Sequence, residues 1–488
     1  MSSSLEAIKG LKPENLWRYF YQLSQIPRES GNEEGVRQWL VAFAQEHGIR
    51  YAVDAIGNVI MYKDPSAGYE QIPSVALQGH MDMVCVKTAD SKHDFTKDPI
   101  ELVRDGEFLK AKDTTLGGDN GIAIAMILDI FTDPTIKHGP LEAIFTISEE
   151  TGLTGAFELD ATLINSRRML NLDSEEEGVV YIGCAGGIEV DASLKAELVE
   201  PPAHWESWTL RVDHMLGGHS GGEIHTQRGN AIKIAARTLH QINLVAPVML
   251  ATLEGGTKRN VIPSICDAVF FAPATAHEDI KKAVEAVQEA VAIEYGVADP
   301  NITITAGCKG AAEGKAMEIN QSHKFIDALF IAPHGVDAMS MTIPGIVETS
   351  SNLAIVTFAE GEYNVVSSHR SSILSARDDV AARMGAALAT CGAVVEFDGA
   401  YPSWTPNPDS AMAKFCAEAY EQLAGKKPVV TAIHAGLECG IINSKIPGMD
   451  SVSLGPDLYG VHSVDEKLSI PSTERTAGFV KQLLAIIK

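Results

Sequence analysis

The sequence predicts an α/β protein in which one domain is interrupted by an inserted α+β domain. Three observations lead to this fold class. Apolar strands alternate with helices at first, strands with a period-two pattern follow from about residue 187, and the alternation of helices and apolar strands returns at about residue 398. A chain of 488 residues also exceeds what one hydrophobic core usually organises. We therefore expect one domain from residues 1–186 and 398–488, and an inserted domain at 187–397.

The first segment contains two predicted helices within residues 14–47 and a hairpin around Gly57-Asn58 at 51–63. An apolar helix is predicted at 121–131. Short apolar strands are predicted at residues 74–82, 140–150 and 167–174. Because these strands are apolar on both faces, they are typical of a sheet that helices cover on both sides.

The inserted segment changes character. Residues 188–201 and 207–216 alternate apolar and polar side chains, which indicates strands with one solvent-facing side. Helices are predicted at residues 229–242, 277–296 and 376–392. This mixture of strands and helices predicts an α+β domain of roughly 200 residues.

The last segment resembles the first in its pattern. A helix is predicted at 409–425, strands at 427–436 and 450–455, and a final helix at 472–488. The simplest arrangement is that this segment completes the domain begun by residues 1–186.

Composition limits the classes of function. The net charge of −25 makes nucleic acid an unfavourable partner, because binding phosphates needs a basic face. Acidity suits solubility, and part of it could belong to a carboxylate-rich site that a cation neutralises. Seven scattered cysteines without a CxxC motif favour free thiols in a reducing compartment. No signal peptide is visible, and the longest apolar stretch is too short for a membrane span, so we expect a cytoplasmic protein.

Acids and histidines stand at the ends of several predicted apolar strands. Ligands of open α/β sheets gather beyond the carboxyl ends of the strands, so these side chains could converge there. They are His80, Asp82, Glu149, Glu150, Asp173 and His462, together with Asp119 just before a helix. Histidine and carboxylate donors suit Zn²⁺, Mn²⁺ or Co²⁺.

The adjacent pair Glu149-Glu150 is the most informative of these. Two carboxylates directly after an apolar strand repel each other unless a cation lies between them. In an extended strand they would point to opposite faces, so that one could hold a metal while the other faces a water. Hydrolysis requires this division of labour.

The order of these motifs resembles the M20 family of dinuclear metallopeptidases. His-x-Asp, Gly-Gly-Asp-Asn-Gly, Glu-Glu-x-Gly, an Asp after a strand and a late His occur in that order. The stretches QGHMDMV, TISEETGLTGA, NLDSEEEG and HAGLECG are similar to the bacterial aminoacyl-histidine dipeptidases within that family. The resemblance implies a phosphorylase/hydrolase-like mixed-sheet catalytic domain (1–186 and 398–488) with an inserted lid domain (187–397).

The resemblance also implies roles for the site residues. His80 and Asp173 would hold one metal, Glu150 and His462 the other, and Asp119 would bridge both. Zn²⁺ is the favoured metal, with Mn²⁺ or Co²⁺ as alternatives.

Two further residues beside the metals receive roles from the same resemblance. Glu149 would act as general base toward a water, and Asp82 would hold the His80 ring by a hydrogen bond.

Residues of the lid and one residue of the last segment are implied to contact the substrate. His219 would face the oxyanion and Asn260 would assist it. Arg370 would bind the substrate carboxylate, although its context SSHRSS departs from the family pattern and His369 stands beside it. Glu438 would bind the amino end of the substrate.

The function implied is hydrolysis of Xaa-His dipeptides such as carnosine, with a small peptide as the partner. A broad-specificity dipeptidase, an aminotripeptidase and an N-acyl amino-acid deacylase are alternatives in the same family. The family often forms homodimers through the lid, but a lid of this size could also complete the site within one chain.

A serine hydrolase is the competing class of enzyme. Residues 218–222 match G-x-S-x-G around Ser220, but the next predicted helix begins near Gly229, too late for a nucleophile elbow. A non-catalytic protein on the same fold is disfavoured by the intact Glu149.

Overall fold

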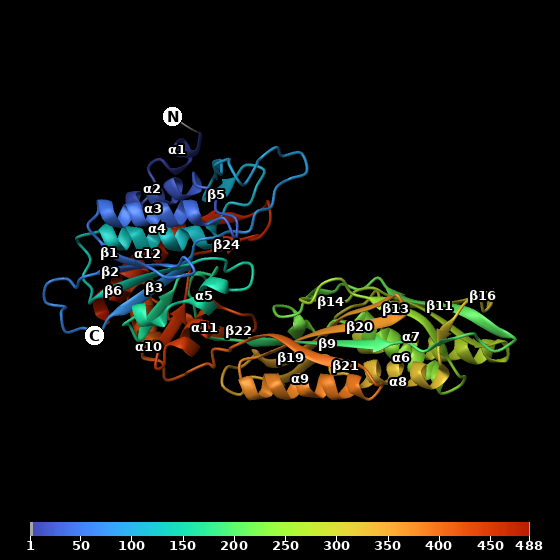
Figure 1. Ribbon diagram of the computed structural model, residues 1–488. Coiled ribbons are helices and arrows are strands. Elements are labelled where there is room, and N and C mark those ends of the chain that lie inside the picture. Colours follow the sequence, from blue (N-terminus) through green and yellow to red (C-terminus); the bar gives the residue numbers. More distant parts are fainter. Residues whose placement is uncertain (1–2, 488) are drawn as a thin grey trace. The chain divides into compact units, whose positions relative to one another are not determined.

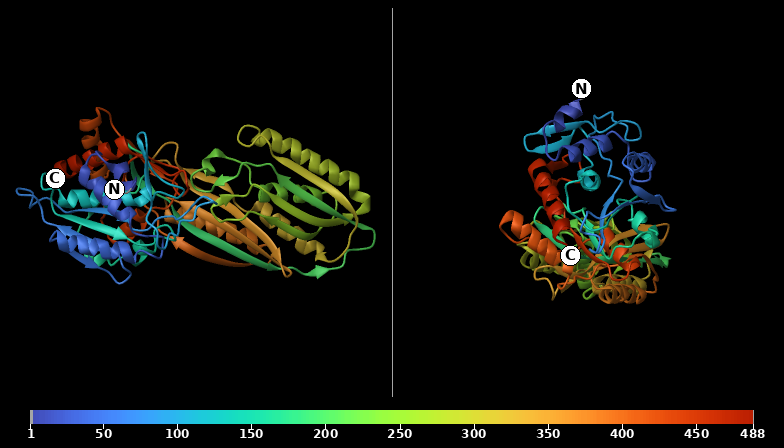
Figure 2. Two further views of the ribbon diagram at one scale, coloured as in Figure 1. Left: turned by 90° about the horizontal axis from the view of Figure 1, so that it is seen from above. Right: turned by 90° about the vertical axis from the view of Figure 1, so that its left-hand side faces the viewer.

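The computed structural model describes residues 3–487, which divide into two compact units. The first unit contains the chain up to Gly183, Pro406–Ala432 and the chain from Leu437 onward, and the second contains Cys184–Thr405 and Ile433–Gly436. Figure 2 shows the two ends of the chain, blue and red, together in the first unit. This unit is therefore assembled from segments that are far apart in the sequence.

The first unit is built on an eight-stranded mixed sheet with the strand order β1-β2-β6-β3-β7-β23-β8-β22. Its members are β1 (Arg50–Val53), β2 (Val59–Lys63), β3 (Val75–His80), β6 (Leu141–Thr146), β7 (Arg168–Asn171), β8 (Val179–Cys184), β22 (Val429–Ile433) and β23 (Asp450–Ser453). The pairs β6–β3, β3–β7 and β7–β23 are parallel, so the ends of these strands meet at one edge. Every residue of β3 and β6 is buried, which confirms the prediction of a covered sheet.

Helices pack on this sheet (Figure 1), with α2, α3 and α4 drawn above its strands. The helices of the first unit are α1 (Ser3–Ile8), α2 (Glu14–Ser24), α3 (Glu34–Glu46), α4 (Gly118–Thr132), α5 (Thr154–Glu158), α10 (Ala411–Ala424), α11 (Glu438–Lys445) and α12 (Ile470–Ile486). α4 packs between α2 and β3, and all of its residues from Ile122 to Phe131 are buried. The predicted last helix extends to Lys488, which lies outside the described residues.

A four-stranded sheet in the first unit pairs strands from the first and the last segment of the chain. Its order is β24-β25-β5-β4, with β4 (Leu102–Asp105), β5 (Phe108–Ala111), β24 (Leu458–Tyr459) and β25 (Lys467–Ser469). The sequence does not predict it, because strands of two to four residues show no clear period. Its loop between β24 and β25 carries His462.

The second unit is built on a nine-stranded sheet, in which β16-β11-β15-β13-β19-β20-β9-β21 form one path and β18 pairs with β19. Its strands are β9 (Gly186–Lys195), β11 (Trp205–Asp213), β13 (Met249–Gly255), β15 (Cys266–Pro273), β16 (Thr303–Ala311), β18 (Gly335–Met339), β19 (Val347–Ala359), β20 (Glu362–Ser371) and β21 (Val394–Tyr401). Burial alternates along β20, as the period-two pattern of this segment predicts. Two small ladders pair β10 (Leu198–Val199) with β17 (Ala316–Met317), and β12 (Gly218–His219) with β14 (Val261–Ile262).

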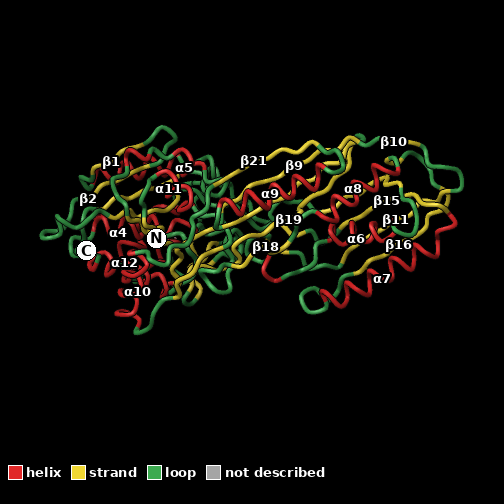
Figure 3. Tube along the Cα trace, turned by 90° about the horizontal axis from the view of Figure 1, so that it is seen from below, coloured by secondary structure: helices red, strands yellow, loops and turns green. Residues whose placement is uncertain are grey.

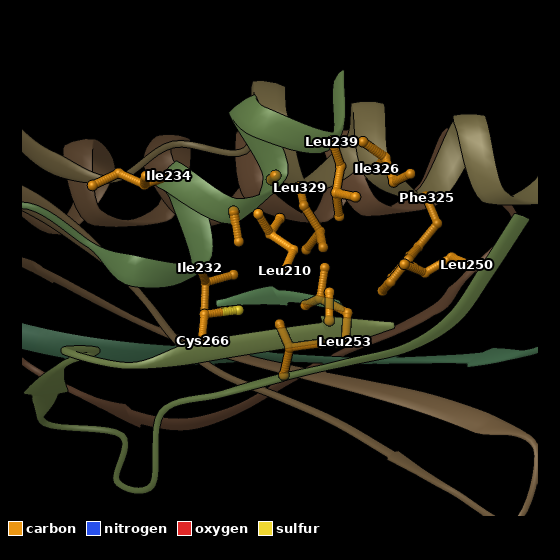
Figure 4. Packing of buried hydrophobic residues seen from close by; sticks show 14 of the residues in the cluster. Leu210, Ile232, Ile234, Leu239, Leu250, Leu253, Cys266, Phe325, Ile326 and Leu329 are labelled. Carbon is orange, nitrogen blue, oxygen red and sulfur yellow. The ribbon is translucent and has the colours of Figure 1, made fainter. Parts of the chain in front are cut away.

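Long helices run along the strands of the second unit (Figure 3). They are α6 (Ala231–Asn243), α7 (His277–Tyr295), α8 (Ile319–Ile331) and α9 (Leu374–Ala389). The helices predicted at 229–242, 277–296 and 376–392 are confirmed, and α8 was not predicted. In Figure 4, side chains of α6 and α8 such as Leu239 and Phe325 point toward Leu210 and Leu253 of the sheet.

Short 3₁₀ turns complete the two units, at Ala161–Leu163, Ile224–Thr226 and Ala274–Ala276. Within residues 3–487, no helix combines the length and apolar character that crossing a membrane requires.

Candidate metal centre

His80 is the last residue of β3, and its ring lies among three carboxylates. Its Nε2 lies 3.0 Å from Oδ1 of Asp119 and 3.4 Å from Oδ1 of Asp173. Its Nδ1 lies 3.2 Å from Oδ1 of Asp82. Because Asp82 occupies Nδ1, Nε2 is the ring nitrogen that a metal could take.

His462 faces the other oxygen of Asp119. Its Nε2 lies 3.1 Å from Oδ2 of Asp119 and 3.1 Å from Oε2 of Glu150. Asp119 therefore presents one carboxylate oxygen to each histidine. The donor atoms of His80, Asp119 and Asp173 lie within 4.8 Å of one another, and so do those of Asp119, Glu150 and His462. These two donor groups share a single carboxylate, so the cluster could hold two neighbouring cations.

The donor set fits divalent cations. Oδ1 of Asp173 is buried without a hydrogen bond from the described residues, although the His80 ring approaches it. Burial raises the pKa of Asp173 to about 6, against the opposing effect of His80. Hydrogen bonds to Asp119 and Glu150 raise the pKa of His462 above its usual range. The cluster thus holds protons that bound cations would displace, and its N and O donors suit Zn²⁺, Mn²⁺ or Co²⁺.

Asp82 ties the end of β3 to the glutamate pair. Its carboxylate accepts the N–H groups of Glu149 and Glu150 at 3.0 and 3.2 Å, and the Ser30 hydroxyl at 2.8 Å. Burial alone would raise the pKa of Asp82, but the hydrogen bonds from His80, Ser30 and Glu149 lower it to about 2. Asp82 is therefore a charged acceptor that fixes both the His80 ring and the position of the two glutamates.

Glu149 is placed differently from what the sequence indicates. β6 ends at Thr146, and the N–H of Gly152 binds the carbonyl of Glu149 in a turn. The expectation that Glu149 and Glu150 lie in an extended strand is therefore wrong. Burial raises the pKa of the Glu149 carboxyl well above its usual range, against the opposing effect of His80. A carboxyl in such surroundings is suited to proton transfer near neutral pH.

Glu438 lies at the start of α11 and is fully buried. Its Oε2 accepts hydrogen bonds from Gln78 and from the Thr146 hydroxyl. Burial raises the pKa of Glu438 to about 8. Its predicted contact with the amino end of the substrate stays a prediction.

Arg28 is a buried residue of this site that the sequence does not single out. Its guanidinium donates to the carbonyls of Met81 and Asp82 at 3.1 and 2.8 Å, and to the carbonyl of Gly117. Arg28 therefore connects the end of β3 with the loop that leads to Asp119.

Asn120 makes a second connection between the segments that carry the ligands. Its side-chain oxygen accepts the N–H of His80 at 3.1 Å, and its amide donates to the carbonyl of Leu172 at 2.9 Å. A Cβ at Gly79 would lie 2.4 Å from the Asn120 oxygen, so only glycine permits this close approach.

Glu466 holds the start of α4. Its carboxylate accepts the N–H groups of Leu116, Gly117, Gly118 and Asp119, at 2.7 to 3.4 Å, and it is 2% exposed. An anion at a helix N-terminus satisfies N–H groups that have no partner within the helix. No local motif marks Glu466, because its partners lie about 350 residues earlier in the chain.

His219, the first of the predicted lid residues, lies on β12 in the second unit. Its Nδ1 accepts the N–H groups of Gly221 and Gly222 at 3.2 and 2.9 Å. Burial, and then the charge of Arg370, lower the pKa of His219. The ring is therefore neutral near pH 7 and carries its proton on Nε2, where it can donate a hydrogen bond.

Asn260 and Arg370 lie in the same unit. Asn260 is exposed, and its carbonyl accepts the N–H of Ser220 at 2.9 Å. Arg370 lies on β20 and donates to the Tyr401 hydroxyl at 3.2 Å. His369 is fully buried against Ser367, so it belongs to the core and does not compete with Arg370 for a substrate role.

Ser220 does not have the surroundings of a nucleophile. It is 2% exposed, and its Oγ has no hydrogen-bond partner among residues 3–487. A serine nucleophile needs a base within hydrogen-bond reach, so the structure gives the serine hydrolase alternative no support.

The chain belongs to peptidase family M20/M25/M40, whose model matches residues 76–485. It is 38% identical over 481 residues to the cytosol non-specific dipeptidase of Escherichia coli strain K12, covering 98% of this chain and 99% of that protein. The solved aminoacylhistidine dipeptidase of Vibrio alginolyticus is also 38% identical, with a TM-score of 0.93 over 99% of this chain and 98% of that one. The aminopeptidase PepT of Bacillus cereus shares the fold at 17% identity, with a TM-score of 0.57 over 97% of this chain and 98% of that one.

Proposed function

We propose that this peptidase is a metal-dependent dipeptidase that hydrolyses Xaa-His dipeptides such as carnosine. The observation that carries the proposal is the pair of donor groups that share Asp119, with the buried Glu149 beside them. Membership of the peptidase family supports it, and so do the names of the Escherichia coli and Vibrio alginolyticus relatives, which are dipeptidases.

Five residues would hold two divalent cations. His80 and Asp173 would hold one, Glu150 and His462 would hold the other, and Asp119 would be shared between them. When bound, such a pair polarises a peptide carbonyl and lowers the pKa of a water. Zn²⁺ is the favoured metal, and Mn²⁺ or Co²⁺ would also fit these donors.

Glu149 would act as the general base. Its carboxylate accepts a proton from the attacking water and passes it to the nitrogen of the leaving amine. Asp82 would keep the His80 ring in place by accepting its Nδ1–H, and would keep Glu149 in place by accepting its N–H.

Four further residues are proposed to hold the substrate. The Nε2–H of His219 would donate to the oxyanion, and Asn260 would assist it. Arg370 would bind the C-terminal carboxylate, for which a guanidinium is well shaped. Glu438 is proposed for the amino end on its position in the sequence.

The preference for histidine is the part of the proposal that needs a direct test, because one relative is named non-specific and the other aminoacylhistidine dipeptidase. The test compares kcat/KM for β-Ala-His, Gly-His, Gly-Leu and N-acetyl amino acids. We expect the two histidine peptides to be hydrolysed fastest. Equal rates for Gly-Leu would make the enzyme a broad dipeptidase, and a preference for N-acetyl substrates would make it a deacylase.

The proposed compartment is the cytoplasm. The Escherichia coli relative is named a cytosolic protein, and Cys85, Cys266, Cys308, Cys391 and Cys416 are free thiols. Two proposals remain for the assembly: a homodimer that forms through the second unit, or a single chain that completes the site alone. Sedimentation equilibrium distinguishes them, because it measures whether the protein in solution has the mass of one chain or of two.

A further inference from the structure

Glu206, His277 and Cys308 form another group of metal-binding side chains, in the second unit. Their donor atoms lie within 4.8 Å of one another. Glu206 lies on β11, Cys308 on the neighbouring edge strand β16, and His277 is the first residue of α7. None of the three belongs to the donor groups around Asp119.

The local structure explains why these side chains meet. Glu206 and the buried Trp208 lie two residues apart on β11 and therefore share a face. Cys308 of β16 pairs with Trp208 of β11, next to a β-bulge at Ser207 and Trp208. A β-bulge changes the direction in which nearby side chains point. The His277 ring lies against the Trp208 ring, with 4.7 Å between their centroids. The three donors thus meet where α7 begins over the β11–β16 pair.

Their spacing matches a tetrahedral ion. Oε2 of Glu206 lies 3.4 Å from Nδ1 of His277 and 3.4 Å from Sγ of Cys308. Zinc at its usual distances from N, O and S ligands places neighbouring donors about 3.4–3.6 Å apart. The His277 and Glu206 side chains are 36% and 27% exposed, which leaves a side open for a water as fourth ligand.

We propose that Glu206, His277 and Cys308 bind a third divalent cation of the Zn²⁺ class, separate from the pair held around Asp119. A mixed set of sulfur, nitrogen and oxygen donors favours Zn²⁺ or Co²⁺ over Mg²⁺ and Ca²⁺. On binding, the Cys308 thiol releases its proton to solvent and the thiolate becomes a ligand. The ion links β11, the edge strand β16 and the start of α7, and so stabilises this end of the second unit.

Cobalt distinguishes this site from the one around Asp119. None of the five residues proposed to hold the other two cations is a cysteine, so a thiolate-to-cobalt charge-transfer band reports on the new site alone. The metal-free full-length protein is titrated with Co²⁺, and bound metal is measured by equilibrium dialysis. We expect three equivalents to bind, with the band rising to its full intensity. Two equivalents without a band would overturn the proposal.

Substitutions show which residues give rise to the thiolate-to-cobalt band. Cys308→Ser should abolish the band and the third equivalent, and His277→Gln should weaken binding of the third equivalent at least about tenfold. Both should leave two equivalents bound. Cys85→Ser is the matched control, because Cys85 is the other cysteine that is not buried, and it should keep the band. A band that survives Cys308→Ser, or disappears in Cys85→Ser, would contradict the assignment.

Hydrogen exchange tests the structural role of the ion and does not depend on catalysis. The third equivalent of Zn²⁺ should slow amide exchange in residues 303–311 of the unmodified chain. It should have no effect in Glu206→Gln, which keeps the size of the side chain. Equal exchange with two and with three equivalents would show that the ion does not link these elements.

Discussion

At the scale of single residues, Asp119 and Glu149 have different proposed roles, Asp119 as the shared metal ligand and Glu149 as the general base. The two oxygens of Asp119 face different histidines, so this residue belongs to both donor groups. Glu149 lies beside them, and its pKa is raised by burial. A raised pKa suits a residue that must take up a proton and release it again in each turnover.

Glu149→Gln removes the proposed base and keeps the size of the side chain. We expect kcat to fall by about 10² to 10⁴, the usual contribution of a general base, while the number of metal equivalents bound stays the same as in the unmodified chain. Steady-state kinetics and elemental analysis of the same preparation check both expectations. The loss of one metal equivalent would identify Glu149 as a ligand instead.

The residues of the proposed site differ in how well the sequence pattern predicts them. His80 and Asp82 stand directly after an apolar strand, so strand topology predicts that they reach the sheet edge. Glu466 and Arg28 carry no such mark, because each acts by binding backbone groups of a distant loop. The role of such residues can be identified only from the folded structure.

At the scale of elements, the site depends on how α4 begins. Asp119 lies in a kinked first turn, where its backbone is not helical. Glu466 binds the N–H groups of this turn, and Arg28 binds the carbonyl of Gly117. The loop after β24 thus supplies both a proposed ligand, His462, and the carboxylate that holds the segment of the bridging ligand.

Glu466→Gln tests this arrangement without removing a ligand. We expect the affinity for Zn²⁺ to fall about 10- to 100-fold, as is usual when a residue that orients ligands is changed. Competition with a chromophoric chelator measures the affinity. Glu474→Gln, at an exposed position of α12, is the control and should bind as the unmodified chain does. Unchanged affinity in Glu466→Gln would show that the turn holds its shape without the carboxylate.

The elements that could be predicted are those with a long and clear pattern. The largely apolar α4 and the helices at 277–295 and 374–389 are of this kind. α8 was missed although Phe325, Ile326 and Leu329 follow a helical spacing, since a short polar start obscures it. The pairing of β5 with β25 brings together Leu109 and Leu468, which are far apart in the sequence, and no local pattern encodes it.

At the scale of the whole molecule, buried histidines of the second unit predict sensitivity to acid. His369 and His434 are nearly inaccessible to solvent, and burial lowers the pKa of each to about 3. Below about pH 6.5 the unfolded chain takes up protons on these rings and the folded chain does not. The free energy of unfolding therefore decreases as the pH falls from about 6.5 toward 3, by about 2 kcal/mol per histidine at pH 5.

Urea unfolding of the metal-free protein at pH 8 and pH 5 checks this expectation. His369→Gln and His434→Gln should each lose less stability between the two pH values than the unmodified chain. His204→Gln, at an exposed position, should lose as much as the unmodified chain. An identical loss in all of these proteins would show that other groups cause the sensitivity to acid.

Hydrolysis that depends on a pair of cations requires the proposed ligands, the turn at the start of α4 and the folded first unit at the same time. A test of this dependence therefore tests the account at all three scales. The most direct measurement titrates the metal-free protein with Zn²⁺ while hydrolysis of β-Ala-His is followed. We expect no activity without metal, full activity at two equivalents on the centre around Asp119, and the same behaviour in Ser220→Ala. Activity that persists in excess chelator, or that Ser220→Ala abolishes, would contradict the proposed metal-dependent hydrolysis.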